Sequence, residues 1–299
     1  MKEIRDIIAA FERRHGEPFA LATLVRARGS SYRRPGARML IASDGNFTGT
    51  LSGGCLEEEV ATRAQTVIAT GKATLLNFDT RLRYGCNGAI EVLVERLRPG
   101  LLDILSAAQR SRRDCMMATV FENCDSLGSK VIEPSDEIPA DAFVQMVHPP
   151  LRLLMIGEGP DSAALRAFAF ILGWEVIERD EATTFPNELD DWTAAIVKTH
   201  NYGRDYAALQ KLLPLGLRYV ALLGPRLRRD PLLHALLEEG VEMRSELFAP
   251  AGLDIGAEGP EQIALAMVAE ILKVFADREA KSLRERRAPI HVVPDLAVA

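Results

Sequence analysis

The sequence predicts an α/β protein in which an N-terminal α+β domain is followed by a doubly wound parallel sheet domain. After residue 150, short apolar runs alternate with helical segments, which is the pattern of parallel strands joined by crossover helices. The paired prolines of His148-Pro149-Pro150 mark a boundary, because prolines resist regular structure. The 299 residues suffice for two domains, which we place at 1–148, including a connecting region, and 149–276, before a polar tail at 277–299.

Periodicity and turn residues predict the elements of the first domain. Apolar residues at helical spacing open the chain, and alternating or apolar runs bounded by Gly, Asp and Asn indicate strands. In chain order we expect a helix at 4–11, strands at 19–25 and 37–42, a helix from residue 55 to about 71, strands at 74–78 and 90–95, a helix at 101–109, and strands at 115–121 and 130–132.

The second domain is predicted from the same signals. We expect strands at 151–156, 174–177, 194–198 and 219–223, with a helix at 162–172, helix-like segments after the later strands, and a final helix at 260–276. Pro260 at the start of the final helix is favourable, because proline is well tolerated in the first helical turn. This alternation predicts a Rossmann-like arrangement with helices on both faces of the sheet.

Composition excludes several classes of protein. A net charge of −6 argues against a general nucleic-acid binder, which carries a basic footprint. The charged, amphipathic start argues against a signal peptide, and no apolar run is long enough to span a bilayer. Cys55, Cys86, Cys115 and Cys124 form no C-x-x-C pair, so we expect free thiols in a reducing cytoplasm, with Cys115 and Cys124 structural.

The turn Ser52-Gly53-Gly54-Cys55 is the strongest candidate site in the first domain. Two glycines let backbone N–H groups approach an anion, and a thiol on the first turn of the following helix sits where the helix dipole favours the thiolate. The alternative is a tight turn with a buried cysteine behind it. Cys86 is a second loop thiol, and the pair indicates soft-sulfur chemistry more than a structural metal site.

A basic hairpin accompanies this turn. Arg33, Arg34 and Arg38 place three guanidinium groups near one turn, with Ser30 and Ser31 beside them. Together with the glycine turn they suit an anionic, phosphorylated ligand, and we expect at least one arginine to contact phosphate. A solvated charged hairpin is the alternative.

The second domain carries part of a dinucleotide-binding pattern. Gly157 and Gly159 follow a strand and open a helix, but Ser162 occupies the position of the third glycine. Asp180 ends the next strand, where an acid can bind a ribose hydroxyl. The alternative is a Rossmann-like domain that binds no nucleotide.

Polar residues follow the later strands at the same sheet edge. Thr199 and His200 come after the third strand and Gly224 after the fourth, so we expect them along one crevice. His200 either faces a ligand or is a loop histidine whose hydrogen bonds are made within the protein. The arginines after Gly224 either hold phosphate or form a solvated face; they are Arg226, Arg228 and Arg229.

Taken together, these segments resemble the XdhC/CoxI family over nearly the whole chain. The first-domain motifs are Gly29-Ser30-Ser31-Tyr32-Arg33-Arg34-Pro35-Gly36-Ala37-Arg38-Met39, Ser52-Gly53-Gly54-Cys55-Leu56-Glu57 and Gly85-Cys86-Asn87-Gly88. The second-domain motifs are Gly157-Glu158-Gly159-Pro160, Thr199-His200-Asn201, Leu223-Gly224-Pro225-Arg226 and Pro250-Ala251-Gly252-Leu253-Asp254-Ile255-Gly256-Ala257. The tail segments Ser282-Leu283-Arg284 and Pro289-Ile290-His291 are also similar.

The resemblance implies an accessory factor for xanthine dehydrogenase and related molybdenum hydroxylases. Such proteins bind the molybdenum cofactor (molybdopterin), assist its sulfuration by a partner cysteine desulfurase, and insert it into the apo-enzyme. Residues 1–148 are then the cofactor-binding domain, with Cys55 reaching the molybdenum end. We therefore expect a maturation factor more than a catalyst, acting in the cytoplasm as a homo-oligomer, without nucleic-acid or membrane partners.

Two rival functions rest on the second domain. One is an NAD(P)-dependent oxidoreductase with a hydride acceptor near His200, and the other is a nucleotide-binding regulator of the client enzyme. Because no second acid or base accompanies His200 in the sequence, we expect binding or docking there and no hydride transfer. A redox assay with nicotinamide cofactors, run beside a test for bound pterin, separates these functions.

Overall fold

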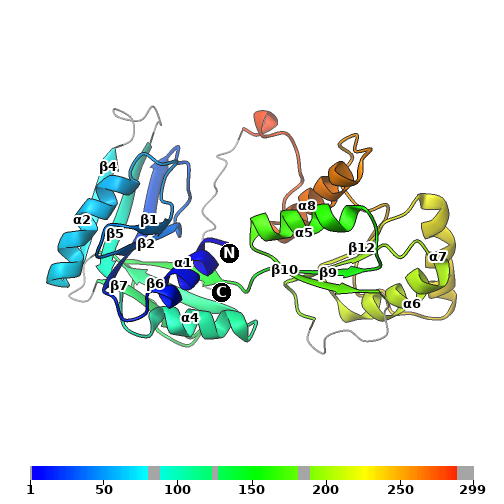
Figure 1. Cartoon of the computed structure of the whole chain (residues 1–299), viewed down its shortest axis with the longest axis horizontal. Coiled ribbons are helices and arrows are strands. Elements are labelled where there is room, and N and C mark those ends of the chain that lie inside the picture. Colours follow the sequence, from blue (N-terminus) through cyan, green and yellow to red (C-terminus); the bar gives the residue numbers. More distant parts are fainter. Residues whose placement is uncertain (1, 80–87, 123–126, 181–188, 288–299) are drawn as a thin grey trace. The chain divides into compact units, whose positions relative to one another are not determined.

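The computed structural model describes residues 2–79, 88–122, 127–180 and 189–287 (Figure 1). The chain divides into two compact units, which are considered one at a time below. Unit 1 comprises Met1–Pro149 with Ser282–Ala299, and unit 2 comprises Pro150–Lys281. Within the described ranges, no helix is both long and apolar enough to cross a bilayer.

The main sheet of unit 1 is antiparallel at every pairing between its strands, in the order β3-β2-β1-β5-β4. Its strands are β1 (Phe19–Gly29), β2 (Arg38–Ala42), β3 (Phe47–Gly49), β4 (Thr74–Asp79) and β5 (Gly88–Arg96). A smaller antiparallel sheet has the order β7-β6-β8, with β6 (Cys115–Val120), β7 (Gly128–Ile132) and β8 (Ala142–Val147). The predicted α+β character of this half is confirmed.

The period-2 pattern of β1 explains how helices cover both faces of the main sheet. Ala20, Ala22 and Leu24 face α2 (Glu57–Thr70), whereas Phe19 and Leu21 pack with α1 (Lys2–Arg13) and α4 (Leu101–Arg110). β1 runs to Gly29, four residues beyond the predicted end, because a bulge between Leu24 and Arg26 preserves its pairing with β5. This extension carries the strand directly into the serine- and arginine-containing loop.

Unit 2 holds a parallel sheet in the order β10-β9-β11-β12-β13. Its strands are β9 (Arg152–Ile156), β10 (Glu175–Arg179), β11 (Thr193–Val197), β12 (Tyr219–Leu222) and β13 (Leu247–Phe248). Its helices are α5 (Asp161–Leu172), α6 (Tyr202–Leu212), η1 (Leu213–Leu215), α7 (Arg226–Glu238) and α8 (Pro260–Phe275), whereas η2 (Leu283–Glu285) lies in the tail that belongs to unit 1. The predicted doubly wound domain is confirmed.

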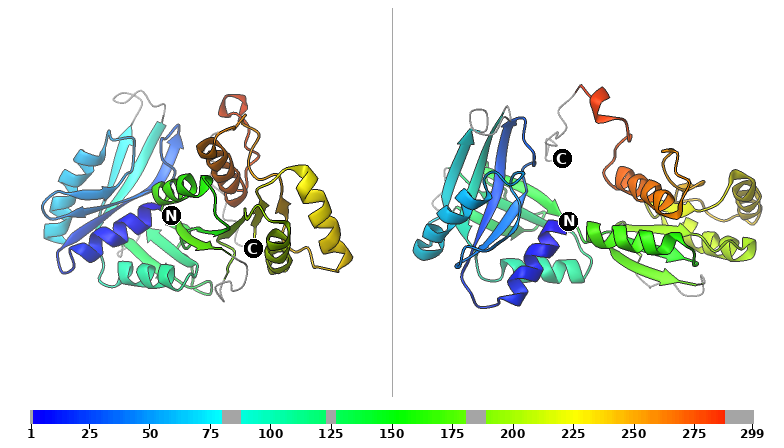
Figure 2. Two further views of the ribbon diagram at one scale, coloured as in Figure 1. Left: turned by 45° about the vertical axis from the view of Figure 1, so that its right-hand side comes forward. Right: turned by 45° about the horizontal axis from the view of Figure 1, so that its top comes forward.

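Helices lie on both faces of this sheet (Figure 2). α5 and α8 pack against Leu153, Met155 and Ile196, and α6 and α7 pack against the alternate residues Leu154 and Val197. The strand order reverses direction between β9 and β11, since β10 lies on one side of β9 and β11 on the other. Loops after these two strands flank the point where doubly wound sheets place ligands.

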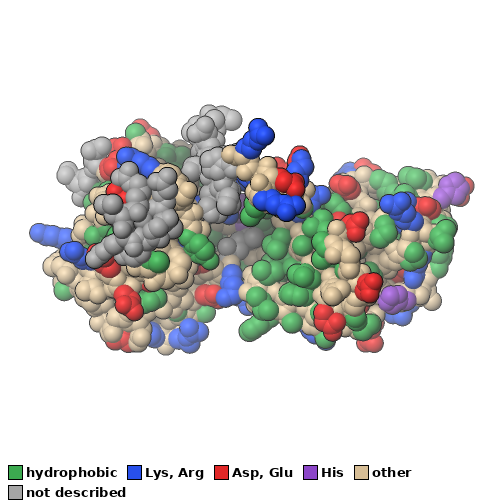
Figure 3. All heavy atoms as spheres, turned by 90° about the horizontal axis from the view of Figure 1, so that it is seen from above, with side chains coloured by type: hydrophobic (Ala, Val, Ile, Leu, Met, Phe, Trp, Pro, Cys, Tyr) green, Lys and Arg blue, Asp and Glu red, His purple; other side chains and the backbone are tan. Residues whose placement is uncertain are grey.

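The outer surface of α5 and α8 is apolar. Phe170 and Ile171 of α5 are 83% and 61% exposed, and Leu265 and Leu272 of α8 are also exposed. Hydrophobic side chains gather on this face of unit 2 (Figure 3). Exposed apolar patches of this kind are typical of protein contact surfaces.

Candidate functional site

In unit 1, the loop after β1 lies close to the glycine turn at residues 52–55 and to the start of β5, at one end of the central strands of the main sheet. Gly29 pairs with Gly88 in the β1–β5 register, and a Cβ atom on Gly88 would lie 2.3 Å from the carbonyl oxygen of Ser30. A Cβ on Gly53 would lie 3.8 Å from the ring of Tyr32, so the glycine turn rests beside the hairpin. The close backbone approach at Gly88 requires glycine, because any side chain would collide with backbone.

The carboxylate of Glu57 organises the glycine turn. It accepts the N–H groups of Leu51 and Ser52 at 3.0 and 2.8 Å through Oε1, and the Ser52 hydroxyl and Leu56 N–H at 2.7 and 3.1 Å through Oε2. Burial alone would raise the pKa of Glu57, but these hydrogen bonds from Ser52 and its neighbours outweigh burial and hold the pKa below its ordinary value. The helix therefore supplies its own anion at its N-terminus.

This arrangement corrects one prediction about Cys55. Helix α2 begins at Glu57, so Cys55 lies in the turn two residues before the helix and not on its first turn. Its backbone N–H donates to the Ser52 hydroxyl at 3.0 Å, which fixes the turn while its side chain stays exposed. The alternative of a buried cysteine is wrong for Cys55, whereas Cys115 is buried as predicted. Cys86 and Cys124 lie outside the described residues.

The three arginines of the hairpin have different environments. Arg33 donates to Glu3 at 2.5 Å and to Thr50 at 2.8 Å. Arg38 is 1% exposed and donates to the carbonyl of Gly36 and the side chain of Gln145. Burial lowers the pKa of Arg38 to about 10, against the opposing attraction of two glutamates. Arg38 is therefore closed to a phosphorylated ligand, and the alternative of a solvated hairpin is also wrong for this residue.

Arg34 and the two serines complete the exposed edge. Arg34 is exposed, and no hydrogen bond or ion pair engages its guanidinium among the residues the structure describes. Ser31 donates its hydroxyl to the carbonyl of Arg33 at 2.6 Å, and Ser30 is exposed. Exposed side chains in these two segments include Ser30, Arg34 and Cys55 of the predicted site, together with Tyr32.

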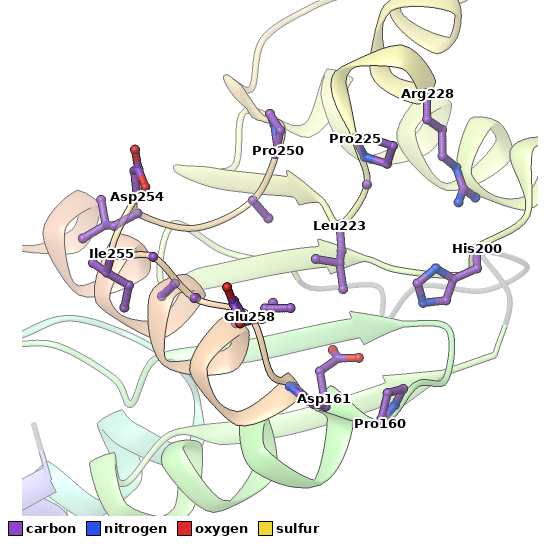
Figure 4. Close-up of a pocket in the computed structure, with 18 residues that line it drawn as sticks. Pro160, Asp161, His200, Leu223, Pro225, Arg228, Pro250, Asp254, Ile255 and Glu258 are labelled. Carbon is purple, nitrogen blue, oxygen red and sulfur yellow. The ribbon is translucent and has the colours of Figure 1, made fainter.

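The second candidate site is a pocket of about 630 Å³ in unit 2 (Figure 4). It lies at the carboxyl edge of the parallel sheet, between the start of α5, the loops after β11 and β12, and the segment before α8. The lining residues are mostly apolar: Pro160, Asp161, His200, Leu223, Gly224, Pro225, Arg228, Pro250, Ala251, Leu253, Asp254, Ile255, Gly256, Ala257, Glu258, Pro260, Ile263 and Ala266. A pocket of this size and lining suits a small molecule.

A buried lysine supports the start of α5. Lys198 is fully buried, and its Nζ donates to the Ser162 hydroxyl at 2.5 Å and lies 3.5 Å from Oδ2 of Asp161. A Cβ on Gly159 would lie 2.6 Å from Oδ1 of Asp161, so this carboxylate covers the glycine turn. Ser162, at the position of the third glycine, therefore holds the lysine.

The loop after β11 approaches the glycine turn closely. A Cβ on Gly157 would lie 2.6 Å from the Cα of Thr199, so glycine is required there. Thr199 donates its hydroxyl to buried Asp205 at 2.5 Å, and Asp205 is ion-paired with Arg228. His200 has a φ of +55°, an uncommon value for a residue other than glycine, and its ring lines the pocket.

The other residues predicted for the crevice are not among the residues that line the pocket, Gly157, Gly159 and Thr199 included. Asp180 is exposed after β10, and its carbonyl accepts from Arg204. Arg226 is exposed at the start of α7 and is not among the lining residues, whereas Gly224 is. Arg229 is engaged by Asp230 and by the carbonyl of Ala249.

Sequence reasoning missed several lining residues. Asp161, Asp254 and Glu258 carry no site prediction from the sequence, and neither does Lys198, which pairs with Asp161. Arg228 is one of the three arginines predicted either to hold phosphate or to form a solvated face, and it does line the pocket. The segment 250–257 was noticed only as a motif, although its run of small and turn-forming residues was a usable signal for a ligand-facing loop.

The chain thus combines an antiparallel domain that carries a thiol-bearing turn with a doubly wound domain that carries a pocket at the carboxyl ends of its strands. Comparison with known proteins identifies the family of both domains. Residues 12–79 match the XdhC and CoxI family, and residues 153–271 match the XdhC Rossmann domain. This chain belongs to the XdhC and CoxI family.

Individual relatives match both units. A Bacillus subtilis protein described as a probable xanthine dehydrogenase subunit is 30% identical, over 86% of this chain and 93% of the relative. "Molybdenum cofactor insertion chaperone PaoD" of Escherichia coli is 26% identical, over 89% of this chain and 86% of the relative. A crystal structure described as a xanthine dehydrogenase from Bacillus halodurans has a TM-score of 0.77 and 26% identity, covering 95% of this chain and 98% of that one.

Proposed function

We propose that this protein is an accessory factor that binds the molybdenum cofactor at the exposed edge of unit 1 and passes it to the apo form of a xanthine dehydrogenase-type molybdenum hydroxylase. The observation that carries the proposal is the exposed thiol of Cys55, held on a glycine turn that lies against Tyr32 of the loop that also carries the exposed Ser30 and Arg34. The name of the Escherichia coli relative, a cofactor insertion chaperone, supports the same role.

The chemistry of these donors fits the cofactor. A cysteine sulfur is a soft ligand suited to a sulfur-rich metal centre. The Arg34 guanidinium presents a planar fork of donors that matches a phosphate. Among the described residues, no group of three or more His, Cys, Asp or Glu is placed to hold a metal ion, so in our proposal the molybdenum arrives within its organic cofactor.

In our proposal each residue at the edge has a binding task. Glu57 fixes the turn through the Leu51, Ser52 and Leu56 N–H groups, so Cys55 is presented without reorganisation on binding. Arg34 neutralises the terminal phosphate. The bound cofactor supplies the molybdenum chemistry that the client enzyme uses.

The exposure of this edge also suits exchange with protein partners. We propose that a cysteine desulfurase reaches the cofactor here to supply its sulfur, and that the client apo-enzyme receives it from the same side. The apolar surface carrying Phe170 and Ile171 supports a further protein contact, either with the client or within a homo-oligomer. We place these events in the cytoplasm, where exposed thiols stay reduced.

Client activation tests the proposal. Purified full-length protein, isolated from a host that makes the cofactor, is mixed with apo molybdenum hydroxylase, and the enzyme activity that appears is measured. Cys55→Ser is expected to reduce activation by about tenfold or more, because serine keeps the shape but loses the soft ligand. Cys115→Ala, at the buried thiol, is the matched control and is expected to activate like wild type.

The outcomes separate this function from its rivals. Equal activation by Cys55→Ser and wild type contradicts the proposal. Robust NADPH oxidation that is abolished by His200→Ala also contradicts it and favours an oxidoreductase using the pocket of unit 2.

A further inference from the structure

The pocket of unit 2 has an acidic, apolar character that the proposed function does not use. Its walls are largely apolar, with Leu223, Pro225 and Ile255 among them. Among its described lining residues, Asp161, Asp254 and Glu258 are carboxylates. The arginine of the lining, Arg228, is already paired with buried Asp205.

Asp161 is the polar group of the pocket that most needs a partner. The residue is 3% exposed, and its Oδ2 is buried and accepts no hydrogen bond from the described residues, although Lys198 Nζ lies 3.5 Å away. In Figure 4 the Asp161 carboxylate and the His200 ring both point into the same space below Leu223. The Lys198 ammonium balances the charge of this carboxylate but donates no hydrogen bond to it, so an N–H group of a ligand can still add one.

The same carboxylate makes the turn unsuited to a pyrophosphate. A dinucleotide places its phosphates against the glycine turn and the free N–H groups of the following helix. Here Asp161 covers Gly159, and the Ser162 N–H donates to the carbonyl of Gly159 at 3.1 Å. A phosphate at this turn would therefore meet the negative charge of Asp161 and a Ser162 N–H that is already hydrogen-bonded.

We infer that this pocket binds an uncharged heteroaromatic molecule of nucleobase or nucleoside size, which donates an N–H hydrogen bond to Asp161 and lies between apolar walls, and that it discriminates against phosphorylated nucleotides. The volume of about 630 Å³ accommodates a molecule of that size. Flat proline and aliphatic side chains suit a planar ring. This inference is independent of cofactor binding in unit 1.

Calorimetric titration of the full chain tests the inference with four probes: adenosine, guanosine, AMP and NAD⁺. At least one nucleoside is expected to bind, with adenosine binding at least about tenfold more tightly than AMP and NAD⁺. Asp161→Asn keeps the shape but offers an N–H of its own, and is expected to weaken nucleoside binding by about tenfold. Glu258→Gln is expected to reduce the difference in affinity between adenosine and AMP, because it removes a negative charge from the exposed rim of the pocket.

Two further variants keep the test decisive. If Asp161→Asn unfolds because Lys198 loses its partner, His200→Asn serves instead, since asparagine tolerates a positive φ and changes the facing ring. Glu242→Gln, at a 61% exposed side chain outside the lining, is the matched charge control and is expected to change nothing. The inference is overturned if no probe binds, if AMP or NAD⁺ binds as tightly as adenosine, or if both pocket variants bind adenosine like wild type.

Discussion

The glycine turns at residues 52–55 of unit 1 and 157–160 of unit 2 look alike in sequence, but the carboxylate that follows each turn has different partners. Each precedes a helix whose first residue is an acid, Glu57 in unit 1 and Asp161 in unit 2. Glu57 accepts the N–H groups of its own turn, whereas Asp161 faces the ammonium of buried Lys198 and a pocket. A glycine turn at a helix N-terminus is thus a poor anion site when the helix supplies its own carboxylate, and the side chains around it decide what it binds.

The largest expected effect comes from removing the ion pair between Lys198 and Asp161 in unit 2. Lys198→Met leaves Asp161 buried without its counter-charge, and the free energy of unfolding of unit 2 is expected to fall by about 3–5 kcal/mol. Urea unfolding followed by tryptophan fluorescence measures it, since Trp174 and Trp192 both lie in unit 2. Adding Asp161→Asn is expected to recover part of the loss. An unchanged urea midpoint in Lys198→Met would show that the ion pair does not support the turn.

The corresponding change in unit 1 removes the turn's acceptor. Glu57→Ala leaves the N–H groups of Leu51 and Ser52 without their acceptor, while the Leu56 N–H keeps the Ser52 hydroxyl, and the change is expected to cost about 2–3 kcal/mol. Urea unfolding followed by circular dichroism, with hydrogen exchange of the turn, measures the loss. The exposed neighbour Glu58 provides the control, Glu58→Ala, for which about 0.5 kcal/mol or less is expected. Equal costs for the two variants would contradict the role of Glu57.

A smaller effect concerns the anion contact. Because Glu57 occupies the turn's N–H groups, we expect the phosphate to be held by Arg34. Arg34→Ala is expected to weaken cofactor retention by about three- to tenfold, and the deficit is expected to shrink at high salt. Retention is measured as pterin content after dialysis at two ionic strengths. Arg110→Ala, at a 71% exposed arginine on α4, serves as control, and identical retention by Arg34→Ala and wild type would exclude a phosphate contact here.

The smallest effect is a dependence on pH. The pKa of Glu57 is lowered from its ordinary value of 4.5, so its stabilising contribution is present above that value and is lost as pH falls through the folded-state pKa. The stability difference between wild type and Glu57→Gln is therefore expected to narrow below pH 4.5. Urea midpoints between pH 6 and pH 3 measure it. A difference that stays constant over this range would show that the carboxylate charge is not what holds the turn.

Most elements were predictable because their signals are local. The apolar runs that end at Ile156 in β9 and at Val25 in β1 identify strands without tertiary information. The strands β3, β8 and β13 were missed. β3 and β13 are three and two residues long and carry no periodicity of their own, whereas β8 has six residues and was missed despite its length. The predicted helix began at Cys55, two residues too early. The sequence does not show that the Glu57 side chain folds back onto the turn before it, because an exposed acid in the first helical turn gives the same sequence pattern.

The candidate sites were predictable only in part. Turn residues such as Gly88 and Gly157 mark close backbone approaches that the sequence indicates well. Burial decides the rest: Arg38 and Arg34 are four residues apart in one basic hairpin, yet one is inside unit 1 and the other faces solvent. The ion pair between Lys198, which follows β11, and Asp161, the first residue of α5, joins residues far apart in the sequence, so no local sequence pattern predicts it.

The molybdenum content of the protein tests the central claim most directly. Wild type, Cys55→Ser and Cys115→Ala are purified in full length from a host that makes the cofactor, and molybdenum is counted per polypeptide. We predict that wild type and Cys115→Ala carry equal molybdenum, while Cys55→Ser retains about a tenth or less. Equal molybdenum in Cys55→Ser and wild type would contradict the assignment of this thiol as the cofactor's ligand.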